Sequence, residues 1–118
     1  MTQDRADLLQ GTMELLVLQI LSHEPMHGWG ITHRIEAGSR QVLQVNQGSL
    51  YPALERMRRK GWIRSEWRTT ENNRRARYYE LTAAGRKQLA AERAAWRRSS
   101  SAVNWILEWA GAGEGGVS

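Results

Sequence analysis

The amino-acid sequence predicts a mostly α-helical fold with a small β-hairpin, an α+β arrangement that ends in one long helix. Two observations lead to this prediction. Apolar residues recur at helical spacing in three early segments, whereas after residue 62 they fall at every second position. Beyond residue 82 helical spacing returns and continues for about 27 residues. Three helices, a hairpin and a long helix follow one another in the order of a winged helix-turn-helix with a C-terminal extension.

A first helix is predicted over residues 12–23, with Thr12 as its N-cap, because its apolar side chains recur at helical spacing. Pro25 ends that helix, since proline has no N–H to donate and clashes with the preceding turn. The His-Gly-Trp-Gly segment at residues 27–30 then opens a second helix, which is short and is expected to end near residues 37–38.

The third helix is preceded by a short extended piece at residues 42–45 and by two possible N-caps, Asn46 and Ser49. Pro52 is tolerated if it lies near the start of that helix. Gly61 follows three cationic residues, which is a typical C-terminal signal. The face expected to pack on the first two helices consists of Leu50, Leu54 and Met57.

Alternating apolar and polar residues predict two strands, at residues 63–68 and 78–81, and a polar turn at residues 70–73 joins them into a hairpin. Thr82 then caps the last helix, which is expected to run to about Trp109. The predicted organisation is an N-terminal arm, a winged helix-turn-helix DNA-binding domain, a dimerisation helix and a disordered tail, at residues 1–11, 12–82, 83–109 and 110–118.

Length and composition limit the classes to which this protein can belong. The 118 residues fit one domain. The chain has no cysteine, which excludes disulfides, thiolate metal sites and cysteine nucleophiles. The N-terminal segment has no apolar block, and the longest early apolar run, at residues 15–18, is far shorter than a membrane span. We therefore expect a cytoplasmic protein with no signal peptide and no membrane partner.

The positive charge of the chain is concentrated in one stretch. The net charge is +5, but the segment from Glu55 to Arg77 alone carries nine Lys or Arg and three Glu. The remaining residues have a net charge of −1. A local basic field of this kind favours a polyanionic partner.

The third helix and the hairpin are the two segments predicted to bind double-stranded DNA. A helix fits into the major groove, and residues near its N-terminal end meet the base edges. Arginines further along the helix are expected to contact phosphates, while the hairpin follows the backbone or reaches the minor groove. The candidate DNA-binding residues are Gln47, Ser49, Tyr51, Pro52, Arg56 and Arg59 on the helix and Asn73, Arg74, Arg75 and Arg77 on the hairpin.

Several segments resemble, in order, those of the PadR family of transcriptional regulators: Leu-Leu-Gln-Gly-Thr at residues 8–12, the proline and His-Gly-Trp-Gly-Ile segment at residues 25–31, the third-helix segment at residues 45–54, and the hairpin segments at residues 61–63 and 77–85. Trp29 stands where that family usually has tyrosine. The resemblance implies a DNA-binding repressor that dimerises through its C-terminal helix and is often released by a small molecule. The short C-terminus resembles the smaller branch of the family, which has a single C-terminal helix.

The last helix carries an apolar seam in which Leu89, Trp96 and Val103 lie seven residues apart, with Leu107 beyond them. At 1.5 Å per residue this helix is about 40 Å long, more than a small helical core can cover. We therefore expect a homodimer, and a two-fold axis predicts an inverted-repeat operator. Paired Trp96 rings are the expected site for a small, flat aromatic effector.

A zinc hydrolase is a remote alternative, because His23 and His27 belong to a His-Glu-x-x-His pattern. That chemistry needs both histidines on one unbroken helix, and Pro25 interrupts it. We therefore expect no enzyme activity, no metal and no cofactor.

Two binding alternatives also remain. One is a winged-helix protein-interaction module with no DNA role, although the basic surface argues against it because protein interface cores are depleted of charge. The other is a single-strand binder that stacks bases on Tyr51, Tyr78 and Tyr79.

Overall fold

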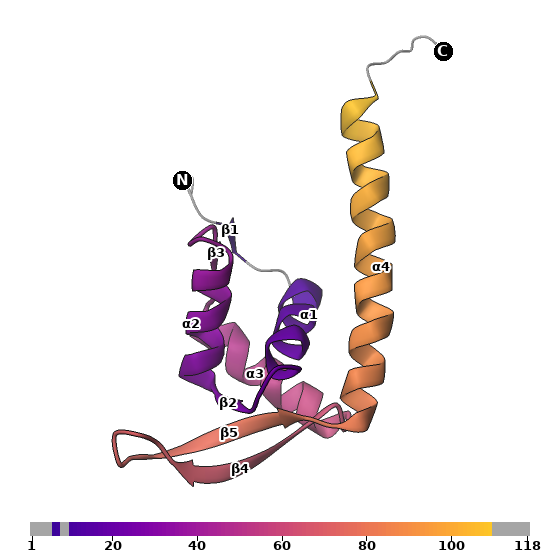
Figure 1. The fold of residues 1–118 in the computed structure, drawn as a ribbon. Helices are drawn as coiled ribbons and strands as arrows, with labels where there is room; N and C mark the ends of the chain where they lie inside the picture. The colour runs from indigo at the N-terminus through magenta and orange to yellow at the C-terminus, as the bar shows by residue number, and fades with distance from the viewer. Residues whose placement is uncertain (1–5, 8–9, 110–118) are drawn as a thin grey trace.

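The computed structural model describes residues 6–7 and 10–109, and Figure 1 shows their arrangement. The expected tail at residues 110–118 and most of the expected N-terminal arm lie outside the described residues. In chain order the elements are β1 (Ala6–Asp7), α1 (Gln10–Leu21), β2 (Met26–His27), α2 (Gly28–Gly38), β3 (Leu43–Gln44), α3 (Gln47–Arg59), β4 (Ile63–Thr69), β5 (Arg75–Leu81) and α4 (Ala83–Glu108). This order confirms the predicted α+β fold with a long C-terminal helix.

Helices α1, α2 and α3 pack into one hydrophobic core beside the β4–β5 hairpin, which we call the wing. The largest fully buried side chains come from each of these helices and from β4: Met13, Val17, Leu18, Ile31, Leu50, Leu54, Met57 and Ile63. The three residues predicted for the inner face of the third helix are among them, so that prediction is confirmed. Burial of each such side chain contributes about 1.5–3 kcal/mol, and together they fix α3 relative to the wing.

The wing belongs to an antiparallel sheet in the order β2-β5-β4. Ile63 pairs with Leu81 at its base and Thr69 with Arg75 near its tip. The third strand, β2, pairs Met26 with Tyr79 and was not predicted, because two residues are too short to display an alternating pattern. It ties the start of α2 to the wing.

The start of the first helix differs from the prediction. Helix α1 begins at Gln10, so Thr12 lies inside the helix and is not its N-cap. Apolar periodicity marks only the buried part of a helix, and the first turn of α1 includes the exposed Gly11. At the other end, α1 stops at Leu21 and the residues that follow form a turn.

The two ends of α3 are set by local hydrogen bonds. Asn46 is the N-cap, and its side-chain oxygen accepts a hydrogen bond from the Gly48 N–H at 2.7 Å, whereas Ser49 lies within the helix. Helix α3 continues through Pro52, its sixth residue. At the C-terminal end, Gly61 adopts φ +81° and the Trp62 N–H donates to the Met57 carbonyl at 3.0 Å, which closes a Schellman motif.

Thr82 is the N-cap of α4, as predicted. Its hydroxyl accepts from the Gly85 N–H at 3.0 Å and donates to the Trp62 carbonyl at 2.9 Å. The first hydrogen bond starts the helix and the second ties that start to the turn after α3. Thr82 therefore fixes the direction in which α4 leaves the wing.

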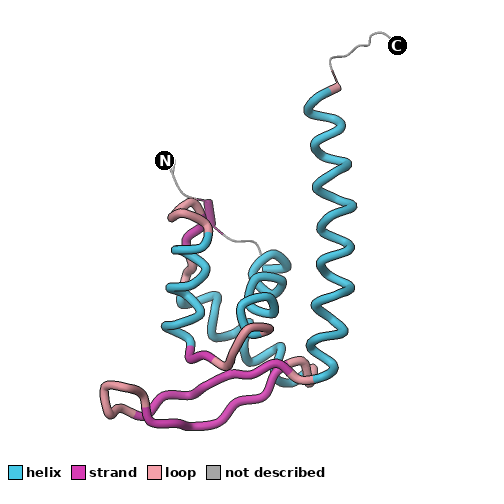
Figure 2. Tube along the Cα trace, viewed as in Figure 1, coloured by secondary structure: helices cyan, strands magenta, loops and turns pink. Residues whose placement is uncertain are grey.

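Helix α4 projects away from the rest of the molecule (Figures 1 and 2). Only its first part, including Leu89, is buried against the core, and the side chains beyond residue 92 are nearly all exposed. The described part of the chain accordingly extends over 63 × 35 × 21 Å. None of the helices described in the structure combines the length and apolar character needed to cross a bilayer.

Candidate nucleic-acid interface

The N-terminal part of α3 presents an exposed polar surface made of four predicted site residues, Gln47, Ser49, Tyr51 and Pro52. The Gln47 side-chain amide donates to the Thr32 hydroxyl at 2.7 Å, so it is held by α2. Ser49 and Pro52 are exposed beside it. This surface can meet base edges without moving the backbone.

Tyr51 is positioned by close packing against Gly28 at the start of α2. A methyl group added at Gly28 would lie 2.7 Å from the Tyr51 Cζ atom, which is closer than real contacts allow. Glycine is therefore needed at this position for the phenol ring to lie where it does. Tyr51 remains 47% exposed and faces the wing.

The arginines of α3 already have carboxylate partners. Arg56 Nε lies 3.5 Å from the nearly buried carboxylate of Glu14, which places the predicted DNA-contacting Arg56 against α1 and apart from the exposed surface. Arg58 and Arg59 both reach Glu55, at 2.7 and 3.4 Å. The hydrogen bond from Arg58 is the main reason that the pKa of Glu55 falls from 4.5 to about 2.

The tip of the wing is a tight turn organised by Thr70. The Thr70 hydroxyl accepts hydrogen bonds from the Asn72 and Arg74 N–H groups, at 3.3 and 3.2 Å. Asn73 adopts φ +61°, a left-handed conformation that asparagine tolerates better than most residues. Arg74 and Arg75 follow directly and are exposed.

The register of the wing places its cations on two different faces. Arg75, Arg77 and Trp67 share the face that carries the buried core residues nearer the base, which we call the inner face. The Arg75 guanidinium lies 5.5 Å from the centre of the Trp67 ring, and Arg77 donates to the Ser65 hydroxyl at 2.9 Å. Among the residues that the structure describes, neither arginine forms an ion pair.

The other face of the wing, which we call the outer face, is electrically balanced. Arg64 and Arg68 lie 3.0 and 3.7 Å from the carboxylate oxygens of Glu80. Arg68 also pairs with Glu66 at 2.6 Å and lies over the Tyr78 ring. Exposed pairs of this kind contribute little stability, but they hold the cations away from other partners.

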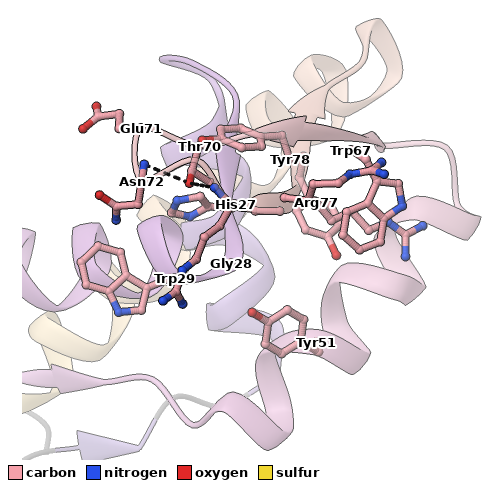
Figure 3. Close-up of a pocket in the computed structure, with 14 residues that line it drawn as sticks. His27, Gly28, Trp29, Tyr51, Trp67, Thr70, Glu71, Asn72, Arg77 and Tyr78 are labelled. Carbon is pink, nitrogen blue, oxygen red and sulfur yellow. Dashed lines mark hydrogen bonds between the residues drawn. The ribbon is translucent and has the colours of Figure 1, made fainter.

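The inner face and α3 enclose a cavity of about 880 Å³, which we call the wing groove (Figure 3). It brings together four of the predicted site residues, Tyr51, Arg74, Arg75 and Arg77. Gln47, Ser49, Pro52, Arg56, Arg59 and Asn73 do not line it. The structure therefore divides the predicted residues between the groove and the start of α3 on one side and Arg56 on the other.

Three aromatic residues of the groove were missed by the sequence analysis: His27, Trp29 and Trp67. Trp29 is 65% exposed and stacks on His33, with ring centres 4.4 Å apart. The His27 Nδ1 atom accepts from the Gly30 N–H at 2.9 Å and so caps α2. Trp29 stands immediately before a helical turn that begins with two glycines separated by one residue, but only the fold shows that its ring meets the wing.

The histidines of the zinc-like pattern are not on one helix. His23 lies in the turn after α1, whereas His27 ends β2 and caps α2. Among the described residues there is also no group of three or more His, Asp or Glu side chains that could hold a metal ion. The geometry that a zinc protease requires is therefore not formed by this pattern.

The predicted seam residues of α4 divide into two groups. Trp96, Val103 and Leu107 are 51%, 56% and 76% exposed, whereas Leu89 is buried in the core of its own chain. A shallow cavity of about 240 Å³ lies between α1 and α4 beside Trp96, and Leu15 also lines it. Leu89 is thus occupied within one chain, while the other three residues present apolar surface to solvent.

Comparison with known proteins identifies the family. The model of the PadR-like family of transcriptional regulators matches residues 17–91. The chain belongs to this family. A transcriptional regulator of Mycobacterium tuberculosis is 33% identical over 86 residues, which cover 73% of this chain and 77% of that protein.

Solved structures of PadR-like regulators share the fold. A PadR-like transcriptional regulator of Bacillus cereus superposes with a TM-score of 0.73 at 28% identity, over 85% of this chain and 95% of that one. A PadR family regulator of Clostridium difficile gives a TM-score of 0.70 at 26% identity, over 80% and 97% of the two chains. The resemblance seen in the sequence is confirmed: this is a winged-helix transcriptional regulator, and its family implies regulation through DNA.

Proposed function

We propose that this PadR-like regulator is a repressor that binds an inverted-repeat operator as a homodimer. The observation that carries the proposal is the placement of Arg75 and Arg77, which lack carboxylate partners among the described residues and share a groove with Tyr51 of α3. Free guanidinium groups suit phosphate, and a helix start beside them suits base edges.

Different residues have different roles in this proposal. Gln47, Ser49, Tyr51 and Pro52 occupy the exposed start of α3 and contact bases or the adjoining backbone. On the wing, Asn73, Arg74, Arg75 and Arg77 contact phosphates or the minor groove. Arg59 is exposed and joins the phosphate contacts, while Arg56 contributes only after it releases Glu14.

The dimer is proposed from the exposed apolar surface of α4. The helix has 26 residues, and its distal part exposes Trp96, Val103 and Leu107 together with Trp105 and Ile106. Exposed apolar residues this numerous favour burial against a second chain. Leu89 is left out of the proposed interface because its own core already covers it.

A small aromatic effector is proposed at Trp96, where the shallow cavity between α1 and α4 offers an apolar surface. Two such cavities would lie near the two-fold axis of the dimer. A ligand there would change DNA affinity only if it binds one arrangement of the two wings more tightly than the other.

The proposal is tested by sedimentation of the full chain with duplex DNA from upstream of its own gene. We expect two chains per inverted repeat and a complex that weakens steeply with salt. A monomer at micromolar concentration would refute the dimer. If this duplex and unrelated DNA both fail to bind, the protein-interaction alternative replaces DNA binding.

A further inference from the structure

The wing groove has the size of a small-molecule site. Its volume of about 880 Å³ lies within the roughly 300–1,000 Å³ of typical ligand pockets. Its walls come from α2, α3 and both strands of the wing, so several parts of the fold form it together. A phosphate contact made by an arginine needs no such hollow.

Aromatic rings line the groove from different elements. Trp29 comes from α2, Tyr51 from α3 and Trp67 from β4 (Figure 3). Trp29 is held by its stack on His33, and Trp67 by the guanidinium of Arg75. Rings that are already held in place offer a flat ligand a stacking surface at little entropic cost.

The charge of the groove is positive. Arg74, Arg75 and Arg77 line it, and Glu71 is the acidic residue among its described lining. No ion pair involves these three arginines in the described part of the chain. The guanidinium fork matches phosphate oxygens in a bidentate way.

The groove also carries groups suited to the edge of a base. Asn72 and Glu71 lie at the turn end of the wing, and Figure 3 shows Asn72 and Trp29 toward one end of the hollow, with Trp67 and Arg77 toward the other. Amide and carboxylate side chains pair with the donors and acceptors of purines. An aromatic face, a polar edge and a cationic end therefore occur in one cavity.

We infer that the wing groove binds a free purine nucleoside monophosphate, with the base on Trp29 and the phosphate on Arg75 and Arg77. A one-ring aromatic acid would leave most of the cavity to water and would not use the polar end. The same base and phosphate chemistry is offered by a nucleotide within single-stranded nucleic acid, and the test below separates the two sources.

Bound nucleotide and operator would compete for Tyr51, Arg75 and Arg77. This consequence rests on the proposed DNA-binding function, whereas nucleotide binding itself does not. The groove would thus act as a second regulatory site, separate from the effector surface at Trp96.

The test is calorimetric titration of the full chain with AMP and GMP. The matching nucleosides and ribose 5-phosphate serve as half-ligand controls, and a five-nucleotide single strand tests the other source. We expect one of the monophosphates to bind at least about tenfold more tightly than either half, because both ends of the groove are used. Equal binding of AMP, GMP and ribose 5-phosphate would overturn the inference, as would tight binding of the single strand alone.

Variants locate the site. Trp29→Ala and Arg77→Gln are each expected to weaken the monophosphate at least about tenfold, whereas Arg64→Gln on the outer face and Trp105→Ala on α4 leave it unchanged. Circular dichroism checks that each variant is folded. The same samples are titrated with duplex DNA by fluorescence anisotropy. Duplex binding without nucleotide binding overturns this inference alone, and nucleotide binding without duplex binding overturns the proposed function alone.

Discussion

The two faces of the wing carry arginines in different electrostatic states. On the outer face, Arg64 and Arg68 both lie within 4 Å of the Glu80 carboxylate, at 3.0 and 3.7 Å. On the inner face, Arg75 and Arg77 form no ion pair among the described residues and contact an aromatic ring and a hydroxyl instead. The same residue type, in the same hairpin, is thus neutralised on one side and available on the other.

This difference teaches that a charge count overstates the binding surface. The segment from Glu55 to Arg77 has nine basic residues, but several are held by acidic neighbours. A paired arginine must lose its partner before it neutralises a phosphate, whereas an unpaired one releases counterions directly. The salt dependence of DNA binding is therefore expected to depend on the inner face.

The largest effect is expected from removing the inner-face charges. Arg75→Gln with Arg77→Gln should weaken duplex binding roughly 100-fold, since each hydrogen bond to a charged group contributes about 1.5–3 kcal/mol. The slope of log affinity against log salt should fall by about 1.8, or 0.9 for each phosphate released. Fluorescence anisotropy at several salt concentrations measures both quantities.

The matched control is Arg64→Gln with Arg68→Gln on the outer face. It should change duplex affinity by no more than about threefold, because these charges are already compensated. An equal loss in the two double variants would remove the distinction between the faces.

A smaller effect is expected from the opposite wall of the groove. Gly28→Ala places a methyl group against the Tyr51 ring and should displace it, so that specific binding falls about tenfold while non-specific binding changes little. Gly38→Ala is the control, since its added methyl group would meet no atom within 4 Å. If Gly28→Ala lowers binding to all sequences alike, Tyr51 only supports the fold.

A gain of binding is expected when a paired cation is released. Glu55→Gln removes the shared partner of Arg58 and Arg59, so non-specific DNA affinity should rise about twofold to threefold and the salt slope should become steeper. Gel shifts with unrelated duplex DNA measure the change. Unchanged affinity would indicate that these arginines point away from the duplex in the complex.

The same carboxylate gives a pH dependence of stability. The pKa of Glu55 is about 2 in the folded chain and 4.5 ordinarily, so its pairing stabilises the fold fully above pH 4.5 and is lost as the pH falls toward 2. The carboxylate remains in contact with water, so a small effect is expected. Urea midpoints at pH 6 and pH 2.5 should differ less in Glu55→Gln than in the wild type.

Local signals in the sequence were enough to predict much of the fold. Asn46 and Thr82 cap their helices and Gly61 ends α3, because each acts through hydrogen bonds within a few residues. The alternating pattern of the wing was long enough to locate both strands. Thr12 was assigned wrongly as a cap, since the exposed first turn of α1 leaves no apolar pattern.

The candidate site was less predictable, because it depends on contacts between distant segments. The pairing of Arg56 with Glu14 joins α3 to α1, and spacing along α3 alone places Arg56 beside Pro52 and Arg59. The burial of Leu89 likewise follows from how α4 leaves the wing. The position of Trp29 over the groove depends on β2, a strand too short for any periodic signal.

The most direct test of the central claim is an NMR titration that follows the arginine side-chain Nε–H signals while operator DNA is added. Our account predicts that Arg75 and Arg77 shift strongly, and that Arg64 and Arg68 on the outer face keep their signals. Large shifts on the outer face with none on the inner face would contradict the proposed DNA-binding surface.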